Sequence, residues 1–228
     1  MWISRTEQPM SPHELCHALG VQTGFTDPNP DSIPSMQTLL ASCLGLVTVD
    51  EEESAVRLVH FTLQEYLNSR SDIFQNPYVL MAQVWLLYLN FDCIRQLPPI
   101  LDAAPHKYLF LRHASCYWGL YARNQTTECV KSLALQLLDG FDSHISACLL
   151  LCILPGELAG SRTGFTGLHC MAYIGVDEIA EALLDIRDWD VDGADCWGRT
   201  PLICASMNGH EGIIKVLLEK AGATLNKA

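Results

Sequence analysis

The stretch "GRTPLICASMNGHEGIIKVLLEKAGATLN", residues 198–226, has a near copy of itself earlier in the chain, within residues 163–193. The matched positions, each 34 residues apart, are Gly164 with Gly198, Thr166 with Thr200, Leu168 with Leu202, Gly175 with Gly209, and Leu183-Leu184 with Leu217-Leu218. Self-similarity at a fixed spacing is the signature of a repeat architecture. The C-terminal segment is therefore predicted to contain two stacked copies of one supersecondary unit.

The residue types of the second copy predict a turn followed by two helices. Gly198 tolerates the positive φ of a tight turn, and Thr200-Pro201 is typical of a helix N-terminus. Gly209 is expected to end that first helix. The second helix has one apolar face, formed by Ile213, Ile214, Leu217 and Leu218.

This turn and helical hairpin resemble an ankyrin repeat, whose period is about 33 residues. The resemblance implies binding through the turn tips and the inner helix faces. Gly167 replaces the usual proline and Ile203 the usual histidine, and both departures are expected to weaken the helix caps. Because repeats bury their apolar faces only against neighbours, two copies and a truncated third at 223–228 need a further packing partner.

The segment before the repeats, residues 76–160, is predicted to supply that partner. Asn76-Pro77 begins a helix that is apolar nearly all round and should lie at the centre of the packing. Further helices are expected over residues 106–123, 126–138 and 142–154. Together they predict a helical linker bundle, a stack of antiparallel helices that leads into the repeats of residues 161–228.

Residues 1–75 are predicted to form a small winged-helix domain. Ser11 is a good N-cap for a first helix, and Glu14 can close a capping box with it. A second helix is expected over 36–44. Two strands follow, "GLVTVD" and "AVRLVHF", and an acidic turn joins them into a hairpin that would be the wing.

A second capping box, Thr62 with Glu65, is predicted directly after the hairpin, so that His60 lies where a strand passes into a helix. A winged helix raises the alternative of DNA binding. Residues 1–61, however, carry two basic residues against eight acidic ones, a net charge of −6. Such a surface would repel phosphates, so nucleic acid is not the expected partner.

The string "GLVTVDEEESAVRLVHFTLQEYL" resembles the winged helix that follows the NACHT nucleotide-binding domain in fungal NLR-like STAND proteins. The helix "HASCYWGLYA" resembles the segment that connects winged helix and ankyrin repeats in that family. The resemblance implies that His60 matches the histidine of the MHD motif, which contacts bound ADP. Val59 and Phe61 replace the flanking Met and Asp, and the chain has no G-x-x-x-x-G-K-[ST] loop. His60 would therefore bind a cofactor only beside an NTPase domain, and otherwise would be a structural histidine.

The string "HELCH", residues 13–17, is a literal HExxH motif and raises the alternative of a zinc metallopeptidase. His13 and His17 are spaced to share a metal, with Glu14 as general base. Thr23, however, occupies the third-ligand position, and Glu14 is better placed as a capping residue. The chain before His13 is also too short for the sheet that builds a zincin cleft, so no metal or catalytic residue is expected.

Composition limits the remaining classes. The net charge of −12 argues against a polyanion binder, and the apolar runs are shorter than the ~20 residues that span a bilayer. Ten scattered cysteines without a CxxC pair or a signal peptide favour reduced thiols and a cytoplasmic protein.

The sequence therefore predicts a non-catalytic protein–protein interaction module without a cofactor. It resembles the signal-relay and sensor portion of an NLR-like protein that lacks its NTPase domain. The expected partner is a protein bound by the ankyrin surface, and the oligomeric state is left open. The candidate contact residues are Asp195, Trp197 and Arg199 at the turn tip, with Met207 and Asn208 nearby.

Overall fold

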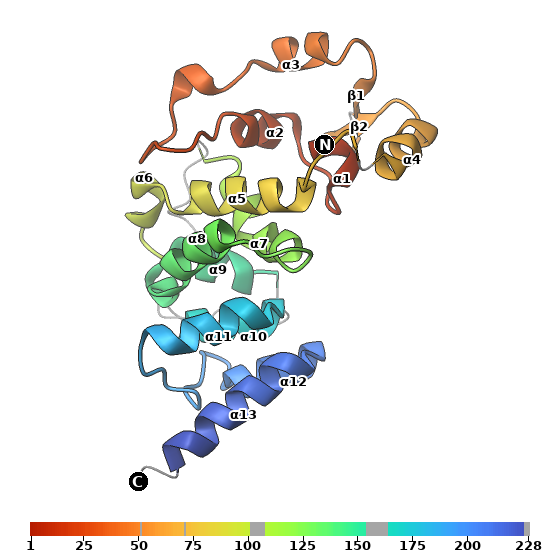
Figure 1. The fold of residues 1–228 in the computed structure, drawn as a ribbon. Coiled ribbons are helices and arrows are strands. Elements are labelled where there is room, and N and C mark those ends of the chain that lie inside the picture. Colours follow the sequence, from red (N-terminus) through yellow and green to blue (C-terminus); the bar gives the residue numbers. More distant parts are fainter. Residues whose placement is uncertain (51, 71, 101–107, 154–163, 226–228) are drawn as a thin grey trace.

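The computed structural model describes residues 1–50, 52–70, 72–100, 108–153 and 164–225. Its class is the predicted one: mainly helical, with an N-terminal winged-helix domain, a linker bundle and C-terminal ankyrin repeats. In Figure 1 the elements succeed one another in chain order, from the N-terminal domain at one end of the molecule to α13 (Glu211–Leu225) at the other.

The N-terminal domain consists of short helices around one β-hairpin. Its elements are α1 (Trp2–Arg5), α2 (Pro12–Leu19), the 3₁₀ helix η1 (Pro30–Ser32), α3 (Met36–Ser42), β1 (Val47–Asp50), β2 (Ala55–Leu58) and α4 (Phe61–Ser69). The predicted capping box begins α2. The Ser11 hydroxyl accepts a hydrogen bond from Glu14 N–H at 3.3 Å, and the Glu14 carboxylate accepts one from Ser11 N–H at 2.7 Å. Two backbone donors are thereby satisfied, which fixes the start of α2.

The wing is closed by its acidic turn. β1 and β2 pair in antiparallel fashion. The Asp50 carboxylate accepts hydrogen bonds from the N–H groups of Glu52 at 3.0 Å and Glu53 at 3.2 Å. Arg57 on β2 forms ion pairs with Asp50 and Glu53. The carboxylates of the acidic turn therefore stabilise the hairpin.

The predicted capping box of Thr62 and Glu65 is wrong, because His60 itself is the N-cap of α4. The His60 Nδ1 accepts a hydrogen bond from Thr62 N–H at 3.2 Å, and α4 begins at Phe61. The two rings of His60 and Phe61 stack with their centroids 4.8 Å apart. His60 thus lies at the predicted strand-to-helix junction, where its contacts are those of a helix cap.

The helix α5 (Pro77–Leu89) lies at the centre of the linker bundle, as its sequence predicts. Trp85, Leu86 and Leu89 are fully buried, and α5 packs against α7 and α8. The other elements of this segment are α6 (Asp92–Arg95), α7 (Leu111–Ala122), α8 (Glu128–Leu138), the 3₁₀ helix η3 (Phe141–Ser143) and α9 (Ile145–Leu151). Residues 106–107 and 154 of the expected helices lie outside the described residues.

The two predicted copies form two helical hairpins that stack on each other. The first is α10 (Gly167–Ile174) with α11 (Asp177–Ile186), and the second is α12 (Pro201–Asn208) with α13. α10 packs against α12, and α11 against α13. Of the proposed third start at 223–228, residues 223–225 continue α13 and the rest lies outside the described residues.

The first hairpin docks on the linker bundle at two glycines that leave no room for a side chain. A Cβ on Gly167 would lie 2.2 Å from the Leu138 carbonyl oxygen, and one on Gly119 would lie 2.4 Å from Ile174 Cγ2. Such distances are far below van der Waals contact. The missing proline at position 167 thus has a packing cause, because α10 approaches the end of α8 too closely to accept one.

Replacing Gly167 by alanine is expected to lower the free energy of unfolding by about 2 kcal/mol or more, because the opposing atom is backbone and has no rotamer to change. Pro201→Ala, at the equivalent position of the second copy, is the matched control and should cost less than about 1 kcal/mol. Urea denaturation measures both values. Wild-type stability in the Gly167→Ala chain would contradict the close approach.

Candidate functional site

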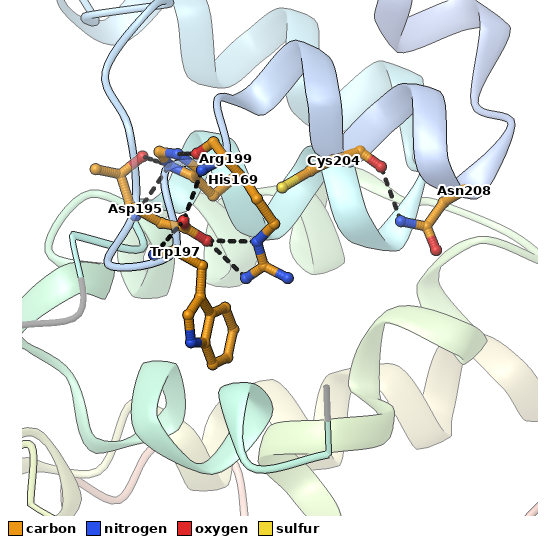
Figure 2. Close-up of polar contacts among 7 residues, drawn as sticks. His169, Asp195, Trp197, Arg199, Cys204 and Asn208 are labelled. Carbon is orange, nitrogen blue, oxygen red and sulfur yellow. Dashed lines mark hydrogen bonds and ion pairs between the residues drawn. The ribbon is translucent and has the colours of Figure 1, made fainter. Parts of the chain in front are cut away.

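The turn that precedes α12 is built around the Asp195 carboxylate (Figure 2). The Asp195 side chain has no exposed surface, and its Oδ1 accepts hydrogen bonds from the N–H groups of Trp197 and Arg199, each at 2.9 Å. Its Oδ2 pairs with the Arg199 guanidinium, at 2.6 Å from Nη2 and 2.8 Å from Nε. Gly198 completes the turn with a φ of +74°. The carboxylate therefore shapes the tip and offers no exposed surface to a partner.

Arg199 lies between Asp195 and Trp197. Its guanidinium carbon is 4.1 Å from the centroid of a Trp197 ring, so a cation–π contact adds to the ion pair. Trp197 is half-buried and packs against the apolar core. In Figure 2 its indole extends from the turn toward the helices that precede the repeats. Trp197 thus has a packing role and still keeps part of its surface accessible.

Met207 and Asn208 do not lie beside the tip. They end α12, whereas the turn precedes its first residue, so the five candidate residues form two groups at opposite ends of one helix. Figure 2 shows Asn208 at the end of α12 far from the turn. Met207 is 67% exposed, and Ile203, one helical turn earlier, is 43% exposed. These two side chains give α12 an accessible apolar stripe.

A buried histidine connects the two repeats. His169 Nδ1 lies 2.8 Å from the Thr166 hydroxyl and accepts a hydrogen bond from Thr166 N–H at 3.3 Å. Its Nε2 therefore carries the proton and donates to the Arg199 carbonyl at 3.0 Å. Burial lowers the pKa of His169 and favours this neutral form. The first helix cap is thus formed despite Gly167, and it also fixes the position of the next turn.

A groove crosses the inner helices where the bundle meets the repeats. It has a volume of about 260 Å³, and its lining includes Tyr117 and Leu120 of α7, Tyr173 of α10, and Asn208 at the end of α12. Arg123, at its edge, donates a hydrogen bond to the Ile174 carbonyl. Asn208 is the one candidate residue in this lining. The α7 residues of this lining were not predicted from the sequence, although the string "HASCYWGLYA" lies on that helix.

The winged-helix domain exposes an apolar patch, here defined as Leu44, Leu46, Val59 and Phe61. Leu44 is 86% exposed and has a φ of +49°, a conformation that a bulky side chain rarely adopts. Val59 N–H donates a hydrogen bond to the Leu46 carbonyl at 3.1 Å, which extends the hairpin at its open end. His60 stacks on Phe61 at the border of this patch.

The HELCH residues serve the fold of the N-terminal domain. Glu14 holds the α2 cap, and Leu15 and Cys16 are buried. In the part of the chain that the structure describes, no three His, Cys, Asp or Glu side chains converge to hold a metal ion. The Glu14 capping role is the predicted one.

Two family models match the chain. One, described as ankyrin repeats in three copies, matches residues 119–228, and the other, described as the winged helix domain of GPI inositol-deacylase, matches residues 1–76. No curated protein and no solved structure matches. The chain therefore carries ankyrin repeats, a non-catalytic interaction module, and a winged-helix domain. The first match begins inside α7, so it includes Leu120 and Tyr173 of the groove lining but not Tyr117.

Over the described residues, the longest apolar helices fall short of what a bilayer crossing requires.

Proposed function

We propose that this chain is a non-catalytic, cytoplasmic protein-interaction and regulatory module whose ankyrin surface binds a protein partner. The observation that carries the proposal is a groove beside a helix with exposed apolar side chains. The groove lined by α7 and α10 reaches Asn208 at the end of α12, and Ile203 and Met207 are exposed on that same helix. Exposed large apolar side chains beside a groove are typical of a protein-binding surface.

Trp197 and Arg199 at the turn tip are proposed as the rim of that surface. Trp197 and Arg199 belong to residue types that are enriched at binding hot spots, and their mutual stacking holds both side chains in place before a partner arrives. Asp195 acts through them, because its carboxylate orients the Arg199 guanidinium. Met207 and Asn208 contribute at the other end of α12.

The winged-helix patch supports a second contact surface at the opposite end of the molecule. Phe61 is 67% exposed, and the strained, exposed Leu44 is the kind of outlier that concentrates at functional sites. In NLR-like proteins, which this chain resembles, the winged helix relays partner binding to an NTPase domain. We propose the same division here: residues 1–75 relay, 76–160 connect and contribute α7 to the groove, and 161–228 bind.

A photo-cross-linking amino acid placed at Met207 tests the binding surface. In an extract of the source cells, we expect Met207 to yield a discrete protein adduct, because its exposed side chain follows directly before Asn208, which lines the groove. The same probe at Glu181, which is exposed on α11, is the matched control and should yield none. Trp197→Ala is expected to weaken the recovered complex about tenfold. Equal adducts at both positions, or none at Met207, would contradict the proposal.

A further inference from the structure

A cavity of about 420 Å³ lies between the winged-helix domain and the linker bundle. The helix α2 and the loop around η1 form one side of it, and α5 and α6 form the other. Its apolar lining includes Pro30, Ile33, Tyr88 and Tyr108, and its charged lining is Asp27 and Asp92. The volume is within the range of about 300 to 1,000 Å³ that is typical of small-molecule sites, which often lie between domains.

Backbone contacts fix the outer wall of this cavity. Asp92 N–H donates a hydrogen bond to the Thr26 carbonyl at 2.9 Å, and Cys93 N–H donates one to Asp27 Oδ1 at 2.9 Å. These bonds tie the loop before η1 to the first turn of α6. Asp27 and Asp92 are therefore held on the same side of the opening.

The Tyr88 hydroxyl is a buried polar group without a use in the fold. Tyr88 is 1% exposed, and its hydroxyl has no hydrogen-bond partner among the described residues. The ring is fixed by edge contacts with Phe91 and Phe110, at centroid distances of 5.8 and 5.1 Å. An unmet buried hydroxyl costs free energy, so its retention calls for a reason.

The neighbours of the Tyr88 hydroxyl are residues of the cavity lining. Burial raises the pKa of Tyr88. The neighbouring Cys93 and Tyr108, which both line the cavity, raise this pKa further. The hydroxyl is consequently protonated at neutral pH and available as a donor. It lies beside a cavity that also has two carboxylates, Asp27 and Asp92, in its lining.

The net charge of the lining is negative. His17, which also lines the cavity, has its pKa lowered by burial and by the charge of His13, so it is neutral near pH 7. Asp27 and Asp92 then provide the only charges among the lining residues that the structure describes. Opposite charge is favoured at such a position, and an anion is repelled.

We infer that this cavity is a binding site for a small organic cation: an amine with an apolar body and an oxygen acceptor. The apolar body packs between Tyr88, Tyr108 and Ile33, the acceptor takes the Tyr88 hydrogen bond, and the ammonium group lies near Asp27 and Asp92. The site is separate from the ankyrin surface and does not depend on the function proposed for it.

The probe is 4-methoxyphenethylamine, which combines a ring, an ether oxygen and an ammonium group, titrated into the full chain. Amide NMR spectra are expected to show saturable shifts at Asp92–Arg95. Tyr88→Phe should weaken binding roughly fivefold, and Asp92→Asn roughly tenfold. Because the Tyr88 hydroxyl has no partner to lose, the Tyr88→Phe chain should be at least as stable as wild type to urea. That result separates a binding role from a structural one.

Two controls accompany this titration. The (4-methoxyphenyl)acetate anion keeps the ring and ether but reverses the charge, and it should not bind. Asp31→Asn removes an exposed carboxylate of η1 that does not line the cavity, and it should leave the affinity unchanged. Absence of saturable amine binding, equal binding of the anion, or wild-type affinity in both Tyr88→Phe and Asp92→Asn would overturn the inference.

Discussion

Replacing Asp195 by alanine is expected to lower the free energy of unfolding by about 3 to 5 kcal/mol. The change leaves the Arg199 guanidinium, which is 16% exposed, without its counter-ion. It also removes the acceptor for two backbone N–H groups, those of Trp197 and Arg199. Loss of one member of a buried, hydrogen-bonded ion pair costs far more than loss of an exposed pair. Urea or guanidinium denaturation of the full chain measures the change.

Asp192→Ala is the matched control for this experiment. Asp192 is in the same loop but is exposed, so its replacement should change the stability by less than about 0.5 kcal/mol. A similar small change for Asp195→Ala would show that the turn does not depend on its carboxylate. The expected loss also means that a binding defect of an Asp195 variant must be compared with its stability before it is assigned to a partner contact.

Acidification from pH 7 to pH 4 is expected to cost roughly 3 kcal/mol of stability through His144 alone. His144 is buried as the N-cap of α9. Its Nδ1 accepts a hydrogen bond from Ser146 N–H at 3.1 Å, and its Nε2 donates to the Leu89 carbonyl at 3.1 Å. Protonation would destroy the first of these bonds. Burial lowers the pKa of His144 to about 4 from an ordinary value of 6.5.

The sign of the effect follows from which state binds protons first. As the pH falls below 6.5, the unfolded chain protonates its histidine while the folded chain does not. The stabilisation is thus complete above pH 6.5 and is lost progressively down to the folded pKa of about 4. Burial also lowers the pKa of His113 to about 4, so it acts in the same direction.

A pH series of urea denaturations tests this origin. His144→Asn keeps a side-chain acceptor for the α9 cap, and we expect its stability to fall less steeply between pH 6.5 and 4 than that of the wild type. His60 is a histidine N-cap of the same kind on α4, but it is exposed. His60→Asn is therefore the matched control, because it removes an exposed histidine cap. An unchanged slope in His144→Asn would assign the acid sensitivity to other groups.

Much of the local structure was predictable from the sequence because it depends on neighbours along the chain. The 34-residue spacing predicted the two hairpins, and glycines 175 and 209 do end equivalent helices in the left-handed conformation. Ser11 and Glu14 form the predicted capping box. The cap of α4 was missed, because His60 lies one residue before the first helical position and competes directly with Thr62 for the same role.

Other features depend on which surfaces meet, and spacing along the chain does not encode that. Asp195 resembled an exposed tip residue, but the fold of its turn buries it against Arg199. Gly167 resembled a weak cap, whereas the approach of the Leu138 carbonyl requires a glycine there. Periodicity and capping therefore determined the secondary structure and the repeat class of this protein from the sequence alone. Only the tertiary structure decided which polar groups are enclosed and where cavities remain, because burial is set by segments that are distant in the chain.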